Sequence, residues 1–110
     1  MLPLKPLVEL QINRSLSDYI TALVWSPVGH RLAIASAAGE VALWQEDFQE
    51  TMLQTASGAS IDVLGFSGDG QWLATAGQPG EVMLWRLSAD SPELVETLTW
   101  GSTWIDRLQW

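Results

Sequence analysis

Few residues of this chain have the types and spacing that catalysis or metal binding requires. The sequence of 110 residues contains no cysteine and one histidine, His30. The lack of thiols excludes disulfides, thiolate zinc sites and cysteine nucleophiles, and one imidazole cannot build a zinc site from several histidines. His30 falls in a predicted turn, and the residue 41 positions further on, where the sequence repeats itself, is Gln71. A solvated turn histidine is therefore favoured over a general base.

Carboxylates are more numerous, and a pair of them could act as a general acid and base. Asp69 lies in a predicted turn, however, while Asp18, Asp62 and Asp106 each stand at the start of a predicted strand. Single carboxylates at such places are usually solvated or bind nearby backbone N–H groups. The segment 67–70, Ser-Gly-Asp-Gly, lacks the alternating oxygen ligands of a calcium loop. We predict no catalytic, cofactor-binding or metal site in this chain.

The composition indicates a folded protein with an acidic surface. Apolar residues make up 47% of the chain and charged residues 16%, which is typical of folding sequences. The 5 basic and 13 acidic residues give a net charge of −8, which repels nucleic-acid phosphates and anionic lipids. No segment approaches the roughly 20 apolar residues of a membrane helix, and prolines 3 and 6 argue against a signal peptide. We expect a cytoplasmic protein that binds neither nucleic acid nor membranes.

The segments that must position these residues occur as two copies of one repeat in the sequence. Residues 20–44 read ITALVWSPVGHRLAIASAAGEVALW and residues 61–85 read IDVLGFSGDGQWLATAGQPGEVMLW, with a constant offset (61 − 20 = 41) and no gap. The run Gly-Glu-Val, for example, occurs at 39–41 and again at 80–82. A third copy begins at residue 105 and reaches Trp110. A repeat of this length indicates a stacked or circular array of one supersecondary unit.

Each copy divides into short strands separated by turn residues. The predicted strands span residues 20–25, 32–37, 40–44 and 50–55, then 61–66, 72–77, 81–87 and 94–100, with an equivalent strand before the first copy at 7–12. The second and third strands of a copy do not alternate apolar and polar residues, so both faces of the sheet must be covered. Blades stacked around an axis provide that arrangement.

A helix is the alternative for one segment. Trp44, Phe48 and Met52 are spaced by four and would line one face of a helix. The equivalent residues of the second copy are Trp85, Ala89 and Glu93, and the apolar stripe is lost. The repeat therefore favours strand and loop.

The pattern resembles the WD40 repeat, the four-stranded blade of a β-propeller. The motifs that carry the resemblance are Trp-Ser-Pro-Val-Gly at 25–29 and Phe-Ser-Gly-Asp-Gly at 66–70, Leu-Ala-Ile-Ala-Ser at 32–36 and Leu-Ala-Thr-Ala-Gly at 73–77, and Val-Ala-Leu-Trp at 41–44 and Val-Met-Leu-Trp at 82–85. The resemblance implies an all-β fold: a partial propeller of about two four-stranded antiparallel blades plus flanking strands. The units are a leading strand and loop at 1–19, repeats at 20–60 and 61–104, and the start of a third repeat at 105–110.

The departures from the family pattern concern its polar residues. Gln45 and Arg86 stand where the family usually has Asp, and the expected Gly-His pair is missing before both first strands. Of the family's buried hydrogen-bond network, Ser36, Trp44 and Trp85 remain. Because an unpaired buried polar group costs about 1–3 kcal/mol, Ser36 must find a new partner.

Two blades cannot close a ring, because propellers close with roughly 4 to 8. We expect the chain to be the N-terminal part of a longer propeller, since the sequence ends inside a predicted core strand at Trp110. The alternatives are several copies assembled into one ring, with self-association through open strand edges, and a two-blade ribbon that is stable alone.

The resemblance implies a non-enzymatic scaffold that binds other proteins. In the family, partners commonly bind the face formed by the loops leading into the first strands and the turns joining second to third strands. By equivalence, that face comprises Asp18, Tyr19, Ser60, Thr103, Trp104, Gln78 and Pro79. Tyr19 and Trp104 occupy one repeat position and either anchor a partner or cap the core.

The remaining aromatic residues are assigned to the core. These are Trp25, Trp44, Phe66, Trp85 and Trp110. The competing functional hypothesis is a fragment of an enzymatic propeller of the hydrolase or lactonase type, with its active site in blades outside this sequence. A cluster of His, Asp and Glu facing a central channel in those blades would distinguish it from a scaffold.

Overall fold

The computed structural model describes residues 19–27, 30–45, 50–78, 80–87 and 91–99. These residues form eight strands and no helix, and hence no helix that could cross a membrane. The strands are β1 (Ile20–Trp25), β2 (Leu32–Ser36), β3 (Val41–Trp44), β4 (Glu50–Gln54), β5 (Ile61–Phe66), β6 (Trp72–Gly77), β7 (Glu81–Arg86) and β8 (Glu93–Thr99). The predicted all-β class is confirmed, and the strand predicted at 7–12 lies outside the described residues.

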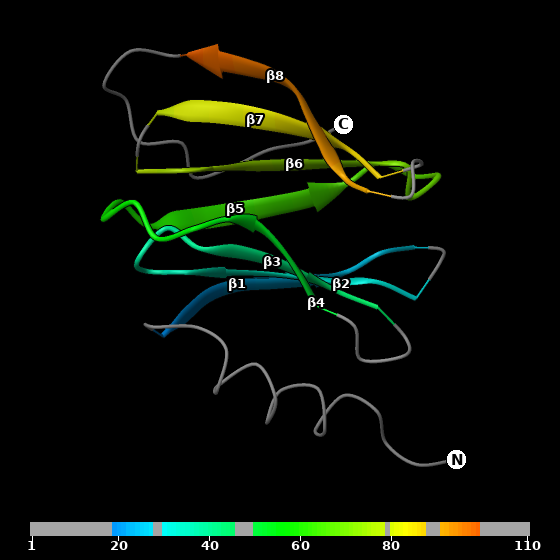
Figure 1. The fold of residues 1–110 in the computed structure, drawn as a ribbon, viewed down its shortest axis with the longest axis horizontal. Helices are drawn as coiled ribbons and strands as arrows, with labels where there is room; N and C mark the ends of the chain where they lie inside the picture. The colour runs from blue at the N-terminus through cyan, green and yellow to red at the C-terminus, as the bar shows by residue number, and fades with distance from the viewer. Residues whose placement is uncertain (1–18, 28–29, 46–49, 79, 88–90, 100–110) are drawn as a thin grey trace.

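The strands form two four-stranded antiparallel sheets, each in chain order. The first sheet runs β1-β2-β3-β4 and the second β5-β6-β7-β8, and Figure 1 shows the second stacked on the first. The registers repeat as well: Leu32 pairs with Trp44 across β2 and β3, and Leu73 pairs with Trp85 across β6 and β7. Each sequence repeat therefore gives the same meander, or blade.

The helical alternative for the Trp44 segment is wrong. Trp44 ends β3 and Met52 lies in β4, where it pairs with Ala42 across the two strands. Phe48 lies outside the described residues. The spacing of four arose by chance from two strands and the loop between them.

Glycines set the tight turns between the second and third strands of each blade. Gly39 has φ 94° and Gly80 has φ 75°, a region that residues with a side chain rarely adopt. Their N–H groups donate to the carbonyls of Ser36 and Gly77, each at 3.1 Å. The repeated Gly-Glu-Val run thus has a physical basis, because its glycine closes the turn and its valine lies inside the next strand.

Serine side chains close the turns at the other end of each blade. The Ser26 hydroxyl accepts from the Arg31 N–H at 2.9 Å, and the Ser67 hydroxyl accepts from the Trp72 N–H at 3.0 Å. Ser67 also donates to Asp69 Oδ1 at 2.7 Å; this bond, followed by one from the Gln71 N–H at 3.0 Å, holds the Asp69 pKa below its ordinary value. Asp69 is therefore bound within its own turn.

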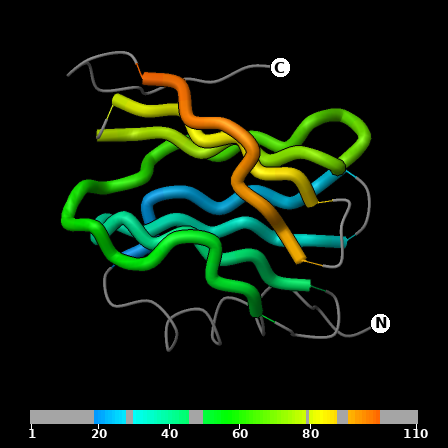
Figure 2. The backbone as a smooth tube through the Cα atoms, turned by 45° about the horizontal axis from the view of Figure 1, so that its top comes forward, coloured from blue at the N-terminus to red at the C-terminus, as the bar shows by residue number. Residues whose placement is uncertain are grey.

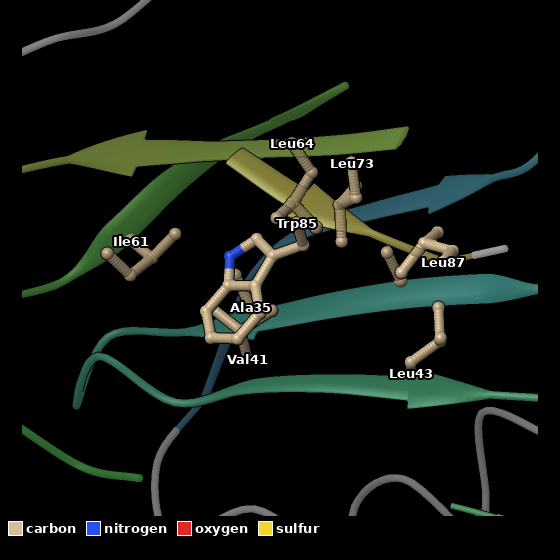
Figure 3. Close-up of a cluster of buried hydrophobic side chains, with 9 residues drawn as sticks. Ala35, Val41, Leu43, Ile61, Leu64, Leu73, Trp85 and Leu87 are labelled. Carbon is tan, nitrogen blue, oxygen red and sulfur yellow. The ribbon is translucent and has the colours of Figure 1, made fainter. Parts of the chain in front are cut away.

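The main hydrophobic core lies between the two blades. Figure 3 shows the Trp85 indole of the second blade lying over Ala35 and Val41 of the first. Phe66 and Met83 are partly buried against the same cluster. Its buried members are Ala33, Ala35, Val41, Leu43, Ile61, Leu64, Leu73, Trp85 and Leu87.

Both outward faces of the pair also bury apolar residues, as the lack of alternation predicted. Leu32, Ile34, Ala42 and Trp44 cluster on the outward face of the first sheet. Residues Ala74, Ala76 and Val82 do so on the outward face of the second. Each sheet therefore has buried apolar residues on both of its faces.

The two faces of a blade differ in kind, and the repeat keeps them distinct. We call the face with Ala33, Ala35, Val41 and Leu43, or in the second blade Ala74, Ala76, Val82 and Leu84, the aliphatic face. The tryptophan face carries Leu23, Leu32 and Trp44, or in the second blade Leu64, Leu73 and Trp85. The aliphatic face of the first blade packs on the tryptophan face of the second, so the blades stack head to tail.

One aromatic residue assigned to the core is not buried. Trp44 and Trp85 are only 6% and 7% exposed, whereas Trp25 is 36% exposed. Phe66, the repeat equivalent of Trp25, is half-buried because its face packs against the first blade. Trp25 lies on the same face of the first blade, which points away from the second. Trp110 lies outside the described residues.

Candidate partner-binding face

β1 and β5 begin at the same end of the molecule as the β2–β3 and β6–β7 turns, on the left in Figure 1. The Ala37 N–H donates to the Tyr19 carbonyl at 3.0 Å in the first blade. In the second, the Gln78 N–H donates to the Ser60 carbonyl at 3.0 Å. These two bonds occupy equivalent positions of the repeat. The residue just before the first strand of each blade is therefore fixed to the turn of that blade.

The linker between β4 and β5 joins the blades at this end. Figure 2 shows it in green, passing from the first sheet to the second along one side. The N–H groups of Ser57 and Gly58 both donate to the Ala38 carbonyl at 2.9 Å. The Thr21 hydroxyl donates to the Ile61 carbonyl, a bond from β1 to β5 across the blades. We call the surface formed by the β2–β3 and β6–β7 turns, Tyr19 and the linker (residues 55–60) the loop face.

Two glycines let these segments approach closely. A Cβ added to Gly39 would lie 2.3 Å from Ser57 Oγ and 2.6 Å from the Ala59 carbonyl oxygen. A Cβ added to Gly77 would lie 2.5 Å from the Ser60 carbonyl oxygen. The loop face is therefore closely packed, without room for a side chain at either glycine.

The structure brings some of the predicted binding residues together. Ser60 and Gln78 are joined twice, by the backbone bond and by a bond of 3.1 Å from the Ser60 N–H to Gln78 Oε1. Tyr19 lies beside the equivalent turn of the first blade and is 72% exposed. Asp18, Pro79, Thr103 and Trp104 lie outside the described residues. Partner binding by this set stays a prediction.

In the first blade, the carboxylate of Glu40 accepts a hydrogen bond from the buried Ser36 hydroxyl. The Ser36 hydroxyl donates to Glu40 Oε1 at 3.0 Å, and the Glu40 N–H donates back to Ser36 Oγ at 3.2 Å. Both residues are buried. Ser36 thus has the new partner that its burial required.

The second blade uses a different pair, which the sequence reasoning missed. The Trp85 indole N–H donates to Thr75 Oγ1 at 3.4 Å. Ile34 stands at the equivalent position of the first blade, so the buried indole nitrogen of Trp44 has no acceptor among the described residues. The available signal was a hydroxyl residue, Thr75, in an otherwise apolar strand that also holds buried alanines.

Charge is distributed unevenly between the two ends of the blades. Glu40, Asp62 and Glu81 stand at the loop-face end, where none of the described residues is Lys or Arg. The two described arginines, Arg31 and Arg86, lie at the opposite end. The described part of the loop face is therefore acidic.

Arg86 is held in place at that opposite end. Its guanidinium carbon lies 5.1 Å from the ring centroid of Trp72, and its Nη1 atom lies 3.4 Å from Glu93 Oε1. Both members of the ion pair are exposed, so the pair contributes little to stability.

The loop face has the groups for recognition: fixed backbone, hydroxyl and amide groups beside an exposed aromatic side chain. No group of three His, Asp or Glu able to hold a metal ion occurs among the described residues. The position of His30 in a turn at the other end, with φ 52°, separates it from these groups. The arrangement suits the binding of a macromolecular surface.

Stacked four-stranded meanders with a closing tryptophan define this chain as blades of a β-propeller. Residues 7–45 and 50–86 match the family described as "WD domain, G-beta repeat", and the chain belongs to the WD40 repeat family. The chain is similar to Polyadenylation factor subunit 2 of Eremothecium gossypii, with 31% identity over 62 residues. That match covers 56% of this chain and 14% of the relative, so the chain spans a small part of the relative's length.

The family's sequence unit is displaced by one strand from the structural blade. The second matched segment, 50–86, contains β4 of the first sheet together with β5, β6 and β7 of the second. This unit therefore contributes to both sheets, and the linker within it joins them covalently.

Proposed function

We propose that this chain is a non-enzymatic scaffold that binds another protein through its loop face. WD40 repeats are typically protein-interaction modules, and the chain carries two of them. The observation that carries the proposal is the repeated hydrogen bond that fixes the residue before the first strand of each blade to the turn of that blade, beside a tyrosine that is 72% exposed. Preorganised loops lower the entropy cost of binding, and exposed Tyr side chains are frequent binding hot spots.

The charge of the loop face favours a basic partner. Asp62 and Glu81 are both partly exposed at this end, and the whole chain carries a net charge of −8. Complementary charge increases the association rate and suppresses wrong partners. A partner whose contacting surface carries Lys or Arg fits this face.

We further propose that the two blades belong to a larger closed ring. Both blades bury apolar residues on both faces, as expected of blades between neighbours. Trp25 supports the same proposal, since its repeat equivalent Phe66 is packed against a neighbouring blade. In a ring, the aliphatic face of a further blade would cover Trp25.

The binding proposal is tested by site-specific photocrosslinking in the complete protein. A photoreactive amino acid replaces Tyr19 in one variant and Arg86, at the opposite end, in the other. The expected result is one partner crosslinked from position 19 and not from position 86. Crosslinking from position 86 alone would place the binding surface at the wrong end for this proposal.

Tyr19→Ala then measures the contribution of the tyrosine side chain. We expect it to weaken binding of the purified crosslinked partner about tenfold or more, as at a binding hot spot. Because Tyr19 is exposed, the melting temperature of the protein should not change. Arg86→Ala is the matched control and should bind as tightly as the wild type.

A further inference from the structure

β8, the outermost strand of the second sheet, exposes more apolar surface than its counterpart β4. Six of its seven residues are exposed, and two adjacent aliphatic residues, Leu94 and Val95, are 47% and 44% exposed. In β4 only Glu50 is exposed, and the other four residues are partly buried. Apolar residues that are exposed side by side mark a candidate interaction site.

The backbone of β8 offers a template for another strand. Its pairing with β7 is regular from Glu96, opposite Leu84, to Thr99, opposite Glu81. The register shifts at Val95, which has no partner in β7, so the regular stretch begins just after the two exposed aliphatic residues. No other described strand pairs with β8 (Figure 1), and an unpaired edge presents free N–H and C=O groups.

The charges of β8 disfavour a second copy of the chain as the added strand. β8 carries Glu93 and Glu96 and no basic residue. Glu93 pairs with Arg86, whereas Glu96 has no ion-pair partner among the described residues. A second β8 strand has no Lys or Arg to place opposite Glu96, and each copy of the chain carries a net charge of −8, so two copies repel each other. A strand with Lys or Arg opposite Glu96 is instead stabilised by the attraction between opposite charges.

We propose that β8 binds an extended, basic segment of a partner protein by strand addition. The main chain of the segment pairs with the outer edge of residues 96–99. A Lys or Arg faces Glu96, and an aliphatic side chain covers Leu94 and Val95. This mode of recognition draws affinity from main-chain hydrogen bonds and specificity from alternate side chains. The regular stretch of β8 runs toward the loop-face end, where Thr99 pairs with Glu81, but the proposed main-chain bonds involve none of the segments that form the loop face.

The proposal is tested with two fluorescent peptides, Lys-Val-Lys-Val-Lys-Val and Glu-Val-Glu-Val-Glu-Val, titrated with the complete protein and followed by fluorescence anisotropy. The basic peptide should bind, and the acidic peptide should not. Glu96→Lys should weaken binding of the basic peptide about fivefold or more and create binding of the acidic one, because a cross-strand attraction becomes a repulsion. Glu50→Lys makes the same charge change on β4 and should alter binding less than about twofold.

Each other result overturns the proposal. Equal weakening by Glu96→Lys and Glu50→Lys would mean that the peptide responds to net charge and not to β8. Loss of binding in Tyr19→Ala would place the peptide on the loop face instead. Absence of binding to the wild type would show that the edge takes no strand of this kind. Because Glu96 and Glu50 are exposed, both variants should keep the near-ultraviolet circular dichroism of the wild type, which checks their folding.

Discussion

At the scale of single residues, the surroundings of Trp44 and Trp85 differ by one hydroxyl group. Trp85 donates to Thr75, whereas Trp44 faces the position of Ile34 and lacks an acceptor among the described residues. An unsatisfied buried donor costs about 1–3 kcal/mol. The second blade therefore provides an acceptor for its tryptophan, while the described part of the first blade only packs around the indole N–H of Trp44.

Thr75→Val should lower the free energy of unfolding by about 1 kcal/mol, because valine keeps the shape of threonine and removes the acceptor. The long bond of 3.4 Å places the effect near the lower end of the range. Urea unfolding followed by tryptophan fluorescence measures it. Thr97→Val on the exposed strand β8 is the control and should change stability by less than about 0.5 kcal/mol. If both variants have the same stability, the Thr75 bond contributes nothing.

Sequence reasoning predicted part of this residue-scale chemistry. It singled out Ser36 because only Ser36, Trp44 and Trp85 remain of the family's polar network, so a buried Ser36 needs a new partner. It did not predict Glu40 as that partner, because a Glu at the start of a strand usually faces solvent. Thr75 was missed because its repeat equivalent is Ile34, so the repeat pattern gave this position an apolar character.

At the scale of elements, Gly39 and Gly58 of the loop face are constrained in different ways. Gly39 and Gly58 both have positive φ, at 94° and 89°. A Cβ at Gly39 would overlap Ser57 and Ala59, whereas a Cβ at Gly58 would meet nothing within 4 Å. The β2–β3 turn is therefore constrained by backbone conformation and by packing, and the linker at Gly58 by conformation alone.

Substituting each of these glycines by alanine separates the contribution of backbone conformation from that of packing. Gly58→Ala should cost about 1–2 kcal/mol, the price of a left-handed conformation for a residue with a side chain. Gly39→Ala should cost at least about 2 kcal/mol more, since the linker must also move. Thermal and urea unfolding measure both variants. Similar losses would show that the linker yields easily and that the loop face is not closely packed.

Strands and turns were the most predictable elements. Two copies of the pattern had to adopt one structure, and that requirement argued against the helical alternative for the Trp44 segment. The register shifts were not predictable. The shifts in the first strands fall at the same place in both blades, between Ile20 and Ala22 and between Ile61 and Val63, but no glycine or proline marks them. The shifts in the pairing of third and fourth strands fall at different places in the two blades.

At the scale of the whole molecule, stability depends on contact between unlike faces of neighbouring blades. The position of Trp25 could not be predicted from its type, because its burial depends on which blade lies beside it. Trp85 has the first blade against it, and Trp25 has no described blade in the equivalent place. The identity of the partner protein is likewise not encoded in the repeat pattern, which specifies blades and not what they bind.

Trp85→Ala should destabilise the 110-residue chain by about 3–5 kcal/mol, because it empties the centre of the contact between blades. Trp25→Ala should cost about 1 kcal/mol in the same chain, since its side chain is partly exposed. Urea unfolding again provides the measurement. A loss at Trp25 comparable to that at Trp85, observed in a longer protein, would show that a blade covers it there.

The head-to-tail stacking of unlike faces has a consequence for how such chains lengthen. Tandem duplication of one 41-residue segment of the gene would insert a blade whose aliphatic face and tryptophan face both find complementary neighbours already in place. The existing contacts would simply be copied, without compensating substitutions. Inserting a partial segment would bring two faces of the same kind together and leave a poorly packed junction, so selection should preserve whole units.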